Sequence, residues 1–178
     1  MSNLSAGSFS AWAQIYRDRG FWPRRIMAGT KASKDIDWQV PDLHQPPERL
    51  KFWEEDGGGY GIGLLMGSPL PDGTKLGGVD IDRDDYVRLT RALLGDPPSG
   101  RIGAKGVVYF VRIRGNASYR YFKIRPAAGE PIKVGELLGD KRLCVLPPTI
   151  HPHANRPYRW IGTPLYEVNF NDLPLLEI

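Results

Sequence analysis

Two aspartates separated by one residue, Asp80 and Asp82, follow a glycine pair in the segment LGGVDID. Val79 and Ile81 alternate with them, which is the pattern of a β-strand with one apolar face and one acidic face. Residues two apart on a strand point to the same side, with their α-carbons about 7 Å apart. Like charges this close are unfavourable unless a cation or a strongly basic partner lies beside them, and carboxylate oxygens are the ligands that Mg²⁺ and Mn²⁺ prefer. The spacing therefore predicts a divalent-metal site.

A carboxylate site of this kind serves phosphoryl transfer when it holds two ions about 4 Å apart, one for the attacking oxygen and one for the leaving oxygen. The alternative is a solvent-facing strand edge that leads into a helix. Asp84 and Asp85 would then interact favourably with the dipole at the helix N-terminus. Both interpretations remain open on the spacing alone.

The elements around the acidic strand are predicted from apolar spacing and turn residues. Helical periodicity predicts helices over residues 8–20 and 83–96. Residues 59–67 predict a strand that pairs with the acidic strand as an antiparallel hairpin across a polar turn. Further strands are predicted on both sides of the GNAS turn in residues 106–125, in RLCVLPP and in PYRW, whereas the proline-rich stretch up to about residue 50 predicts irregular structure.

This order of elements predicts an α+β fold, mainly antiparallel sheet with flanking helices. We expect residues 1–178 to form a single domain. Its parts would be an N-terminal helix and basic loop over about 1–55, a metal-binding core over about 56–165 and a C-terminal tail over about 166–178.

The composition is that of an ordinary globular protein, with 41% hydrophobic and 25% charged residues. No apolar run is long enough to cross a membrane and no secretion signal is evident, so we expect a cytoplasmic protein without a membrane partner. The single cysteine, Cys144, excludes an internal disulfide and a multi-cysteine zinc site. Its apolar neighbours predict a buried, inert thiol.

Basic residues cluster in two parts of a chain whose formal net charge is +4. One cluster lies in the first 34 residues, and the other runs from Arg112 to Arg125 without a single acidic residue. Such clusters suit a phosphate backbone, although a solvated face is an equal alternative for either one. The candidate nucleic-acid ligands are Lys31, Arg112, Arg114 and Lys123.

Three blocks, in this order, carry a family resemblance: WAQIYRDRGFWPRRIMAGTKASKDIDWQ, then YGIGLLMG followed by GGVDID, and finally LCVLPPTIHPHANRPYRW. From about Trp12 to Trp160 the chain resembles the bifunctional primase-polymerase family of phage and plasmid replication proteins, a branch of the archaeo-eukaryotic primases. The resemblance implies an RRM-like catalytic core within the α+β class. It also implies template-directed nucleotidyl transfer from nucleoside triphosphates, in DNA replication, with two Mg²⁺ or Mn²⁺ ions.

The resemblance also implies roles for individual residues. Asp80 and Asp82 match the first acidic motif of the family and would be both catalytic residues and metal ligands. A third carboxylate comes from a later strand, for which Glu136 is the best match and Asp140 the competitor. The expected partners are a single-stranded DNA template, nucleoside triphosphates and a helicase module or partner.

The chain departs from the family where many members carry a histidine in a G-x-H-x-Y-F strand. Val107 or Val108 stands there, and the segment resembles instead a phage-borne subset in which Arg101 and Lys105 would bind the triphosphate. The PPTIHP element adds two nucleotide-binding candidates, Thr149 and His151, for which a structural role is the alternative.

Two other functions share part of this pattern. A metal-dependent nuclease would use the same carboxylates without a triphosphate pocket. A non-catalytic RRM-like module for single-stranded nucleic acid would use the basic surface, and its acidic residues would only shape that surface.

Overall fold

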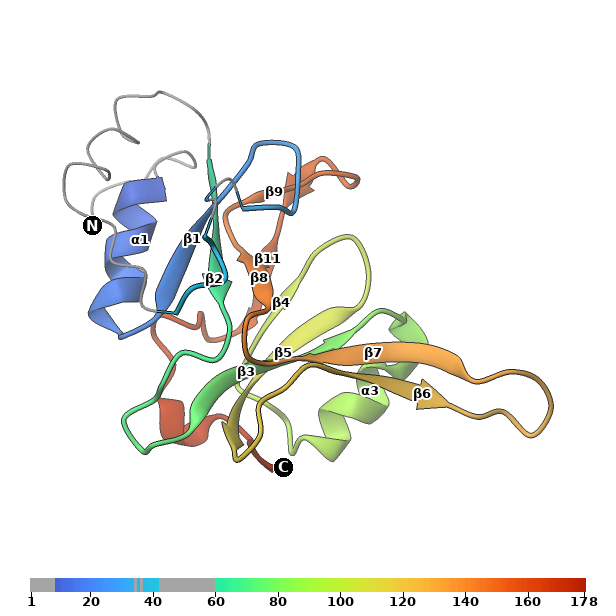
Figure 1. Ribbon diagram of the computed structural model, residues 1–178. Coiled ribbons are helices and arrows are strands. Elements are labelled where there is room, and N and C mark those ends of the chain that lie inside the picture. Colours follow the sequence, from blue (N-terminus) through green and yellow to red (C-terminus); the bar gives the residue numbers. More distant parts are fainter. Residues whose placement is uncertain (1–8, 34, 36, 42–59) are drawn as a thin grey trace.

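The acidic strand lies inside the larger of two main sheets in the computed structural model, which describes residues 9–33, 35, 37–41 and 60–178 (Figure 1). This strand, β3 (Lys75–Ile81), pairs antiparallel with β5 (Val107–Arg114) on one side and β7 (Ile132–Leu138) on the other. The strand order is β11-β4-β5-β3-β7-β6, and β12 pairs with β5 in parallel. The remaining strands of this sheet are β4 (Ser99–Ile102), β6 (Arg120–Ile124), β11 (Arg159–Gly162) and β12 (Leu175–Glu177).

A second sheet contains β1 (Trp22–Ile26), β2 (Gly61–Leu65) and β8 (Leu143–Leu146), in the order β1-β2-β8 and antiparallel throughout. The short strands β9 (Ile150–His151) and β10 (Arg156–Pro157) pair with each other. Two helices, α1 (Phe9–Asp18) and α3 (Asp84–Leu93), and the 3-10 helix η1 (Phe170–Asp172) complete the described elements. The α+β class is confirmed, and so are helices within both predicted ranges. The prediction of irregular structure up to about residue 50 is wrong for Trp22–Ile26, which form β1 because they pair with β2 over five residues. Residues 42–50 of that stretch lie outside the described residues.

The predicted hairpin between β2 and β3 is wrong, because the two strands belong to different sheets. Immediately after β2, Gly67 adopts a φ of 93°, which turns the chain out of the smaller sheet. Three backbone hydrogen bonds link the flanks of the turn, from Gly67 N to Leu76 O, from Leu76 N to Ser68 O and from Leu70 N to Thr74 O. Pairing of the turn with β3 is limited to the isolated bridge between Pro69 and Lys75. In contrast, β2 pairs over five residues with β1 and over four with β8.

The two faces of the larger sheet are covered by different elements. On one face, Val79 and Ile81 pack with Tyr109 and with Tyr86 and Val87 of α3. The opposite face packs against the smaller sheet and α1 through a second core. From the larger sheet this core takes Leu76, Val108, Phe110 and Leu138, and from the other elements Phe9, Tyr16, Ile62, Leu64, Cys144 and Leu146. Cys144 is fully buried, as predicted.

The glycine pair before Asp80 is explained by this packing. A Cβ on Gly77 would lie 2.3 Å from Ile113 Cδ1, and a Cβ on Gly78 would lie 2.9 Å from Val108 Cγ1. A side chain at either position would force its neighbour on β5, Ile113 or Val108, to shift. The pair therefore keeps the acidic strand tightly packed in the sheet.

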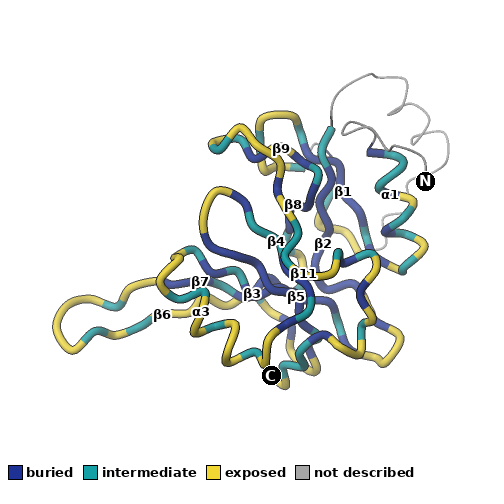
Figure 2. The backbone as a smooth tube through the Cα atoms, turned by 180° about the vertical axis from the view of Figure 1, so that it is seen from behind, coloured by how far each residue is buried: buried dark blue, intermediate teal, exposed yellow. Residues whose placement is uncertain are grey.

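Burial is concentrated in β3, β5 and the smaller sheet, whereas α3 and the far end of the β6–β7 hairpin are largely exposed (Figure 2). This hairpin extends away from the rest of the molecule (Figure 1). In the ranges that the structure describes, no helix is both long and apolar enough to cross a bilayer.

Candidate active site

One residue from each of five strands forms a row across the larger sheet. Asp80 of β3 lies opposite Val108 of β5 on one side and Glu136 of β7 on the other. The row continues from Val108 to Arg101 of β4, and from Glu136 to Tyr121 of β6. Residues directly opposite each other in an antiparallel sheet point to the same face, about 5 Å from their neighbours. The sheet therefore brings an arginine and two carboxylates together on the face that packs on the smaller sheet.

The row separates the two candidates for the third carboxylate. Glu136 is the direct partner of Asp80. Asp140 lies near the other end of β3, where its carboxylate accepts hydrogen bonds from Lys75 Nζ at 2.8 and 3.0 Å. The geometry therefore favours Glu136 over Asp140 as the third acidic residue of the site.

The row also identifies which valine stands nearest the carboxylates. Val108 is opposite Asp80 and shares its face, whereas Val107 is opposite Ile81 and packs in the core beneath α3. Val108 is fully buried and carries no charge. Arg101 is the next residue along the row, and its positive charge acts on the carboxylate of Asp80.

Asp80 is partly buried at the end of the core between the sheets. Burial raises the pKa of Asp80 to about 6; Arg101 and Lys31 work against this shift, while Asp82 and Glu136 add to it. A carboxylate in such a place is stabilised by additional positive charge. The raised pKa therefore indicates a site that favours a cation.

Glu136 is engaged by two hydrogen-bond donors. Its Oε2 accepts from Tyr119 Oη at 2.8 Å and from Lys133 Nζ at 2.7 Å. Although burial works in the opposite direction, these two hydrogen bonds lower the pKa of Glu136. Lys133 Nζ also lies 3.7 Å from Asp82 Oδ2. An ammonium group is thus shared between the carboxylates of Asp82 and Glu136.

Three carboxylates on one face provide hard oxygen donors, which fit Mg²⁺ or Mn²⁺. Within the described residues, however, no group of three or more histidine, cysteine or acidic side chains is arranged so that it could hold a metal ion. Asp80 is the direct cross-strand partner of Glu136, whose carboxylate is turned toward Lys133 and Tyr119. The oxygen donors are therefore of the type that binds a divalent ion, but the carboxylates of Asp82 and Glu136 are arranged around the ammonium group of Lys133.

Arg101 combines burial with an unused donor. Its guanidinium lies over the Tyr158 ring, 4.8 Å from the ring centroid. Its Nε is buried without a hydrogen-bond partner among the described residues. Unsatisfied donors of this kind are rare in folded proteins and often mark a place where a ligand or water binds. Arg101 is thus well placed to bind an anion next to Asp80.

Lys105 is exposed on the β4–β5 loop, which is anchored close to the acidic strand. Gly106, with a φ of 62°, approaches Ile81 O so closely that a Cβ would lie 1.8 Å from that oxygen. Gly106 N also donates to Asp84 Oδ1 at 2.7 Å. These contacts hold the loop beside the end of β3 that carries Asp82.

His151 is buried and has a defined hydrogen-bonding state. Its Nδ1 accepts from the backbone N–H groups of His153 and Ala154, each at 3.2 Å. Burial, followed by the charges of Lys31 and other neighbouring basic groups, lowers the pKa of His151. The neutral ring therefore carries its proton on Nε2, which makes this atom a hydrogen-bond donor.

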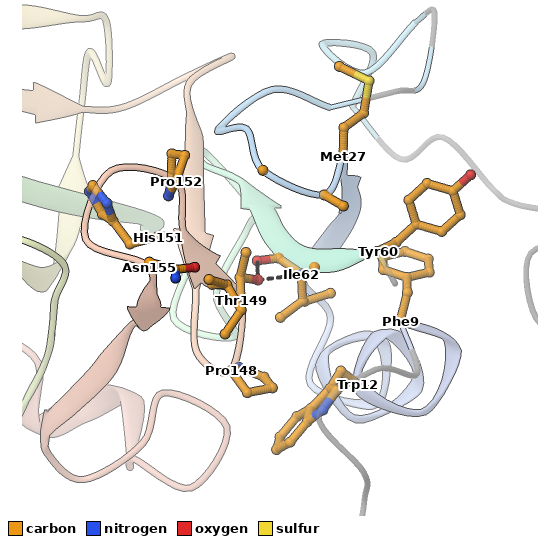
Figure 3. Close-up of a pocket in the computed structure, with 14 residues that line it drawn as sticks. Phe9, Trp12, Met27, Tyr60, Ile62, Pro148, Thr149, His151, Pro152 and Asn155 are labelled. Carbon is orange, nitrogen blue, oxygen red and sulfur yellow. Dashed lines mark hydrogen bonds between the residues drawn. The ribbon is translucent and has the colours of Figure 1, made fainter. Parts of the chain in front are cut away.

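A pocket of about 300 Å³ opens beside the PPTIHP element (Figure 3). Phe9 and Trp12 of α1 line it together with Tyr60, while Thr149 and His151 form part of the opposite wall. Residues 27–29 also line the pocket, and the same loop carries Lys31. The acidic residues of the row do not line it. Lys31 interacts electrostatically both with Asp80 of the row and with His151 of the pocket wall.

Thr149 connects this element to β2. Its Oγ1 accepts from Ile62 N at 2.7 Å and donates to Ile62 O at 3.0 Å (Figure 3). The side chain fits against Gly61, where a Cβ would lie 2.3 Å from Thr149 Cγ2. This geometry describes a structural link, and contact of Thr149 with a nucleotide stays a prediction.

Replacing Thr149 with valine should lower the free energy of unfolding by about 1–3 kcal/mol, because the buried Ile62 N–H would lose its partner while the shape is preserved. Urea denaturation measures the change. Thr149→Ser keeps the hydroxyl and is the matched control. Equal stability of the valine variant and the wild type would show that this link does not hold the element in place.

The predicted nucleic-acid ligands do not lie together. Arg112 forms an ion pair with Asp72 at 2.7 Å, and Arg114 forms one with Glu177 at 2.7 Å, both toward the end of β5 away from the acidic row. Lys123 is on the projecting hairpin with its Nζ 5.0 Å from the Tyr121 ring centroid. Of these candidates, Lys123 is two residues from Tyr121 of the row, and Lys31 interacts electrostatically with Asp80.

Lys133 was not predicted from the sequence, because a regular strand places residues three apart on opposite faces. The pairing of β6 with β7 shows why it reaches Glu136. Phe122 is opposite Gly135, but Lys123 is opposite Lys133, so Val134 is an extra residue in β7. Such a β-bulge re-aims the side chains beyond it. This bulge brings Lys133 to the face of Glu136. No local feature of the sequence predicts the bulge.

The family profile described as "Bifunctional DNA primase/polymerase, N-terminal" matches residues 16–175. The match covers nearly the whole chain and confirms the resemblance seen in the three sequence blocks. No curated protein matches the chain at a significant level.

Proposed function

Because the chain belongs to the bifunctional DNA primase/polymerase family, whose substrates are DNA and nucleotides, we propose that the row around Asp80 is its nucleotidyl-transfer site. The reaction would join a nucleoside triphosphate to a primer 3′-hydroxyl, or to a first nucleotide, on a single-stranded DNA template. One observation carries this proposal: Asp80, Glu136 and Arg101 lie in one cross-strand row on the same face of the sheet, and Val108 is the one residue of the row between Asp80 and Arg101.

Asp80, Asp82 and Glu136 would hold the divalent ions, Mg²⁺ or Mn²⁺. When bound, such ions polarise the α-phosphate and stabilise the leaving pyrophosphate. The carboxylates would act by binding and orientation. Asp80 sits most deeply, at the edge of the core, so its position is the least adjustable of the three.

Basic residues around the row would bind the triphosphate. Arg101 offers its unpaired Nε and a rigid guanidinium fork beside Asp80, which suits bidentate contact with phosphate. Lys105 and Lys31 would add point charges from two loops. His151 would donate from Nε2 to a phosphate or sugar oxygen, and it needs no change of charge to do so.

The projecting β6–β7 hairpin would contribute to template binding. Tyr121 is 54% exposed and ends the acidic row, and Lys123 lies over its ring. An exposed aromatic ring beside a lysine can stack on a base while the charge meets the backbone phosphate. Template held there would lead directly to the carboxylates.

A single assay separates this function from the two alternatives. The protein is incubated with primed and unprimed single-stranded DNA, labelled nucleotides and Mn²⁺. Growth of the labelled chain supports nucleotidyl transfer, whereas shortening of the template indicates a nuclease. Binding of the DNA without either product, and without any effect of Asp80→Ala or Asp82→Ala, indicates a non-catalytic binding module.

Replacing Arg101 with methionine should raise the KM for the nucleotide by about 10-fold to 100-fold, because a buried charged donor to the triphosphate is lost. The turnover number should change less. Steady-state incorporation at varied nucleotide concentration measures both constants. Arg159→Met, an exposed arginine on the neighbouring strand β11, is the control. An unchanged KM in Arg101→Met would remove this residue from the triphosphate site.

A further inference from the structure

Lys133 provides positive charge at the place where the metal ligands converge. Its Nζ is 2.7 Å from Glu136 Oε2 and 3.7 Å from Asp82 Oδ2. Asp82 directly follows β3 and Glu136 belongs to the neighbouring strand β7, so a single ammonium group joins carboxylates from two neighbouring segments. The lysine side chain is 43% exposed and can leave this position without disturbing the core.

The position of Lys133 is built into the sheet. If β7 continued as a regular strand without the bulge at Val134, Lys133 would stand three residues from Glu136 and point to the opposite face, which α3 covers. Tyr119 Oη holds the same carboxylate oxygen at 2.8 Å, which orients Glu136 toward the lysine. The β-bulge in β7 and the hydrogen bond from Tyr119 therefore both favour the ion pair between Lys133 and Glu136. A chance contact between two surface side chains would need neither of them.

An ammonium group and a divalent ion repel each other strongly if both lie between the carboxylates of Asp82 and Glu136. Like charges about 4 Å apart repel, and the repulsion doubles when one of the charges is divalent. Glu136 Oε2, moreover, cannot turn to a metal ion while it accepts hydrogen bonds from Lys133 and Tyr119. Ion binding through Glu136 therefore requires Lys133 to withdraw.

We propose that Lys133 is a resident counter-cation of the acidic row, which neutralises Asp82 and Glu136 in the metal-free protein and which a divalent ion displaces. The inference rests on the proposed function, because it takes these carboxylates as the metal ligands. Its consequence is that Lys133 weakens metal binding and keeps the carboxylates together until the ion arrives.

The test is a titration of the full chain with Mn²⁺ alone, in which free Mn²⁺ is followed by electron paramagnetic resonance at pH 7.5. Lys133→Met should bind Mn²⁺ about tenfold more tightly than the wild type, because a competing charge is gone. Lys133→Arg should retain the wild-type affinity. The matched control is Lys75→Met, which removes the same charge and breaks the ion pair with Asp140 in the same sheet. It should bind as the wild type does.

Thermal melting provides a second readout. Metal-free Lys133→Met should melt at a lower temperature than the wild type, since two carboxylates lose their counter-charge. Mn²⁺ should raise its melting temperature by more than it raises that of the wild type. Equal or weaker Mn²⁺ affinity of Lys133→Met relative to the wild type would overturn the displacement.

The same titration distinguishes this inference from the proposed function. If the wild type binds Mn²⁺, if Asp82→Asn weakens that binding and if Lys133→Met leaves it unchanged, only the role of Lys133 fails. If Asp80→Asn and Asp82→Asn bind Mn²⁺ as the wild type does, or if no variant binds it, the metal site itself fails and the displacement fails with it.

Discussion

Replacing Asp80 with asparagine should reduce nucleotide incorporation on the order of a thousandfold or more. An amide keeps the shape of the side chain but loses the negative charge that would hold a divalent ion beside the α-phosphate. Asp80 is central in the row. Val108 on one side has no side-chain oxygen to offer, and Glu136 on the other side would already hold an ion, so neither would replace the lost carboxylate. Primer extension with labelled nucleotides at saturating Mn²⁺ measures the loss.

The same substitution should stabilise the metal-free protein. Burial raises the pKa of Asp80 to about 6, so the ionised side chain is less favourable in the folded chain than in the unfolded one. Removing this penalty should increase the free energy of unfolding at pH 7.5 by up to about 3 kcal/mol. Urea denaturation without metal measures the gain.

A surface aspartate provides the control for both measurements. Asp85 is exposed and pairs with Arg83 at 3.0 Å, so Asp85→Asn changes the net charge by the same amount away from the row. We expect almost no effect of Asp85→Asn on activity or stability. Full activity of Asp80→Asn would contradict the assignment of Asp80 as a metal ligand. A loss of stability as large as the expected gain in stability would contradict the conclusion that burial disfavours the ionised side chain.

Lowering the pH should weaken Mn²⁺ binding about tenfold for each pH unit below about 6, because the ion binds the ionised form of Asp80, whose pKa is about 6. Between pH 7 and pH 4 the loss should approach a hundredfold. Isothermal titration with Mn²⁺ across this range measures it. Affinity that stays constant down to pH 5 would show that Asp80 does not control the binding of the ion.

The stability of the metal-free protein should respond to pH in the opposite direction. The raised pKa means that the folded chain binds a proton at Asp80 between about pH 6 and pH 4, where the unfolded chain does not. The contribution of Asp80 to stability should therefore rise as the pH falls through this window, and fall as the pH increases. The difference between wild type and Asp80→Asn isolates this contribution, since the variant lacks the titrating group.

The local parts of the fold were predictable from the sequence. Helical spacing in residues 8–20 and 83–96 predicted helices that are confirmed as α1 and α3. The alternation of Val79 and Ile81 with the aspartates predicted the acidic strand with one core-facing side, as the packing of these two residues beneath α3 confirms. Such features depend on neighbouring residues only, and the order of the motifs was sufficient to indicate the family.

Pairing between distant segments was not predictable in the same way. The sequence left Glu136 and Asp140 open, and likewise Val107 and Val108, because each choice depends on register across strands. The prediction of a β2–β3 hairpin was wrong for a related reason. The two strands follow each other in the chain, which suggested that they pair, but β2 belongs to the other sheet, where Ile62 and Leu64 are buried against other elements.

In the candidate site, too, the local features were predictable from the sequence and the pairing between distant segments was not. The sequence by itself determined that two carboxylates share one side of a strand, since alternation is a property of the extended backbone. Only the tertiary structure placed Arg101 and Glu136 in the row with Asp80, put Arg112 and Arg114 toward the other end of β5, and turned Lys133 to the acidic face. Register and the bulge in β7 are set by how whole sheets pack, and a local pattern does not contain that information.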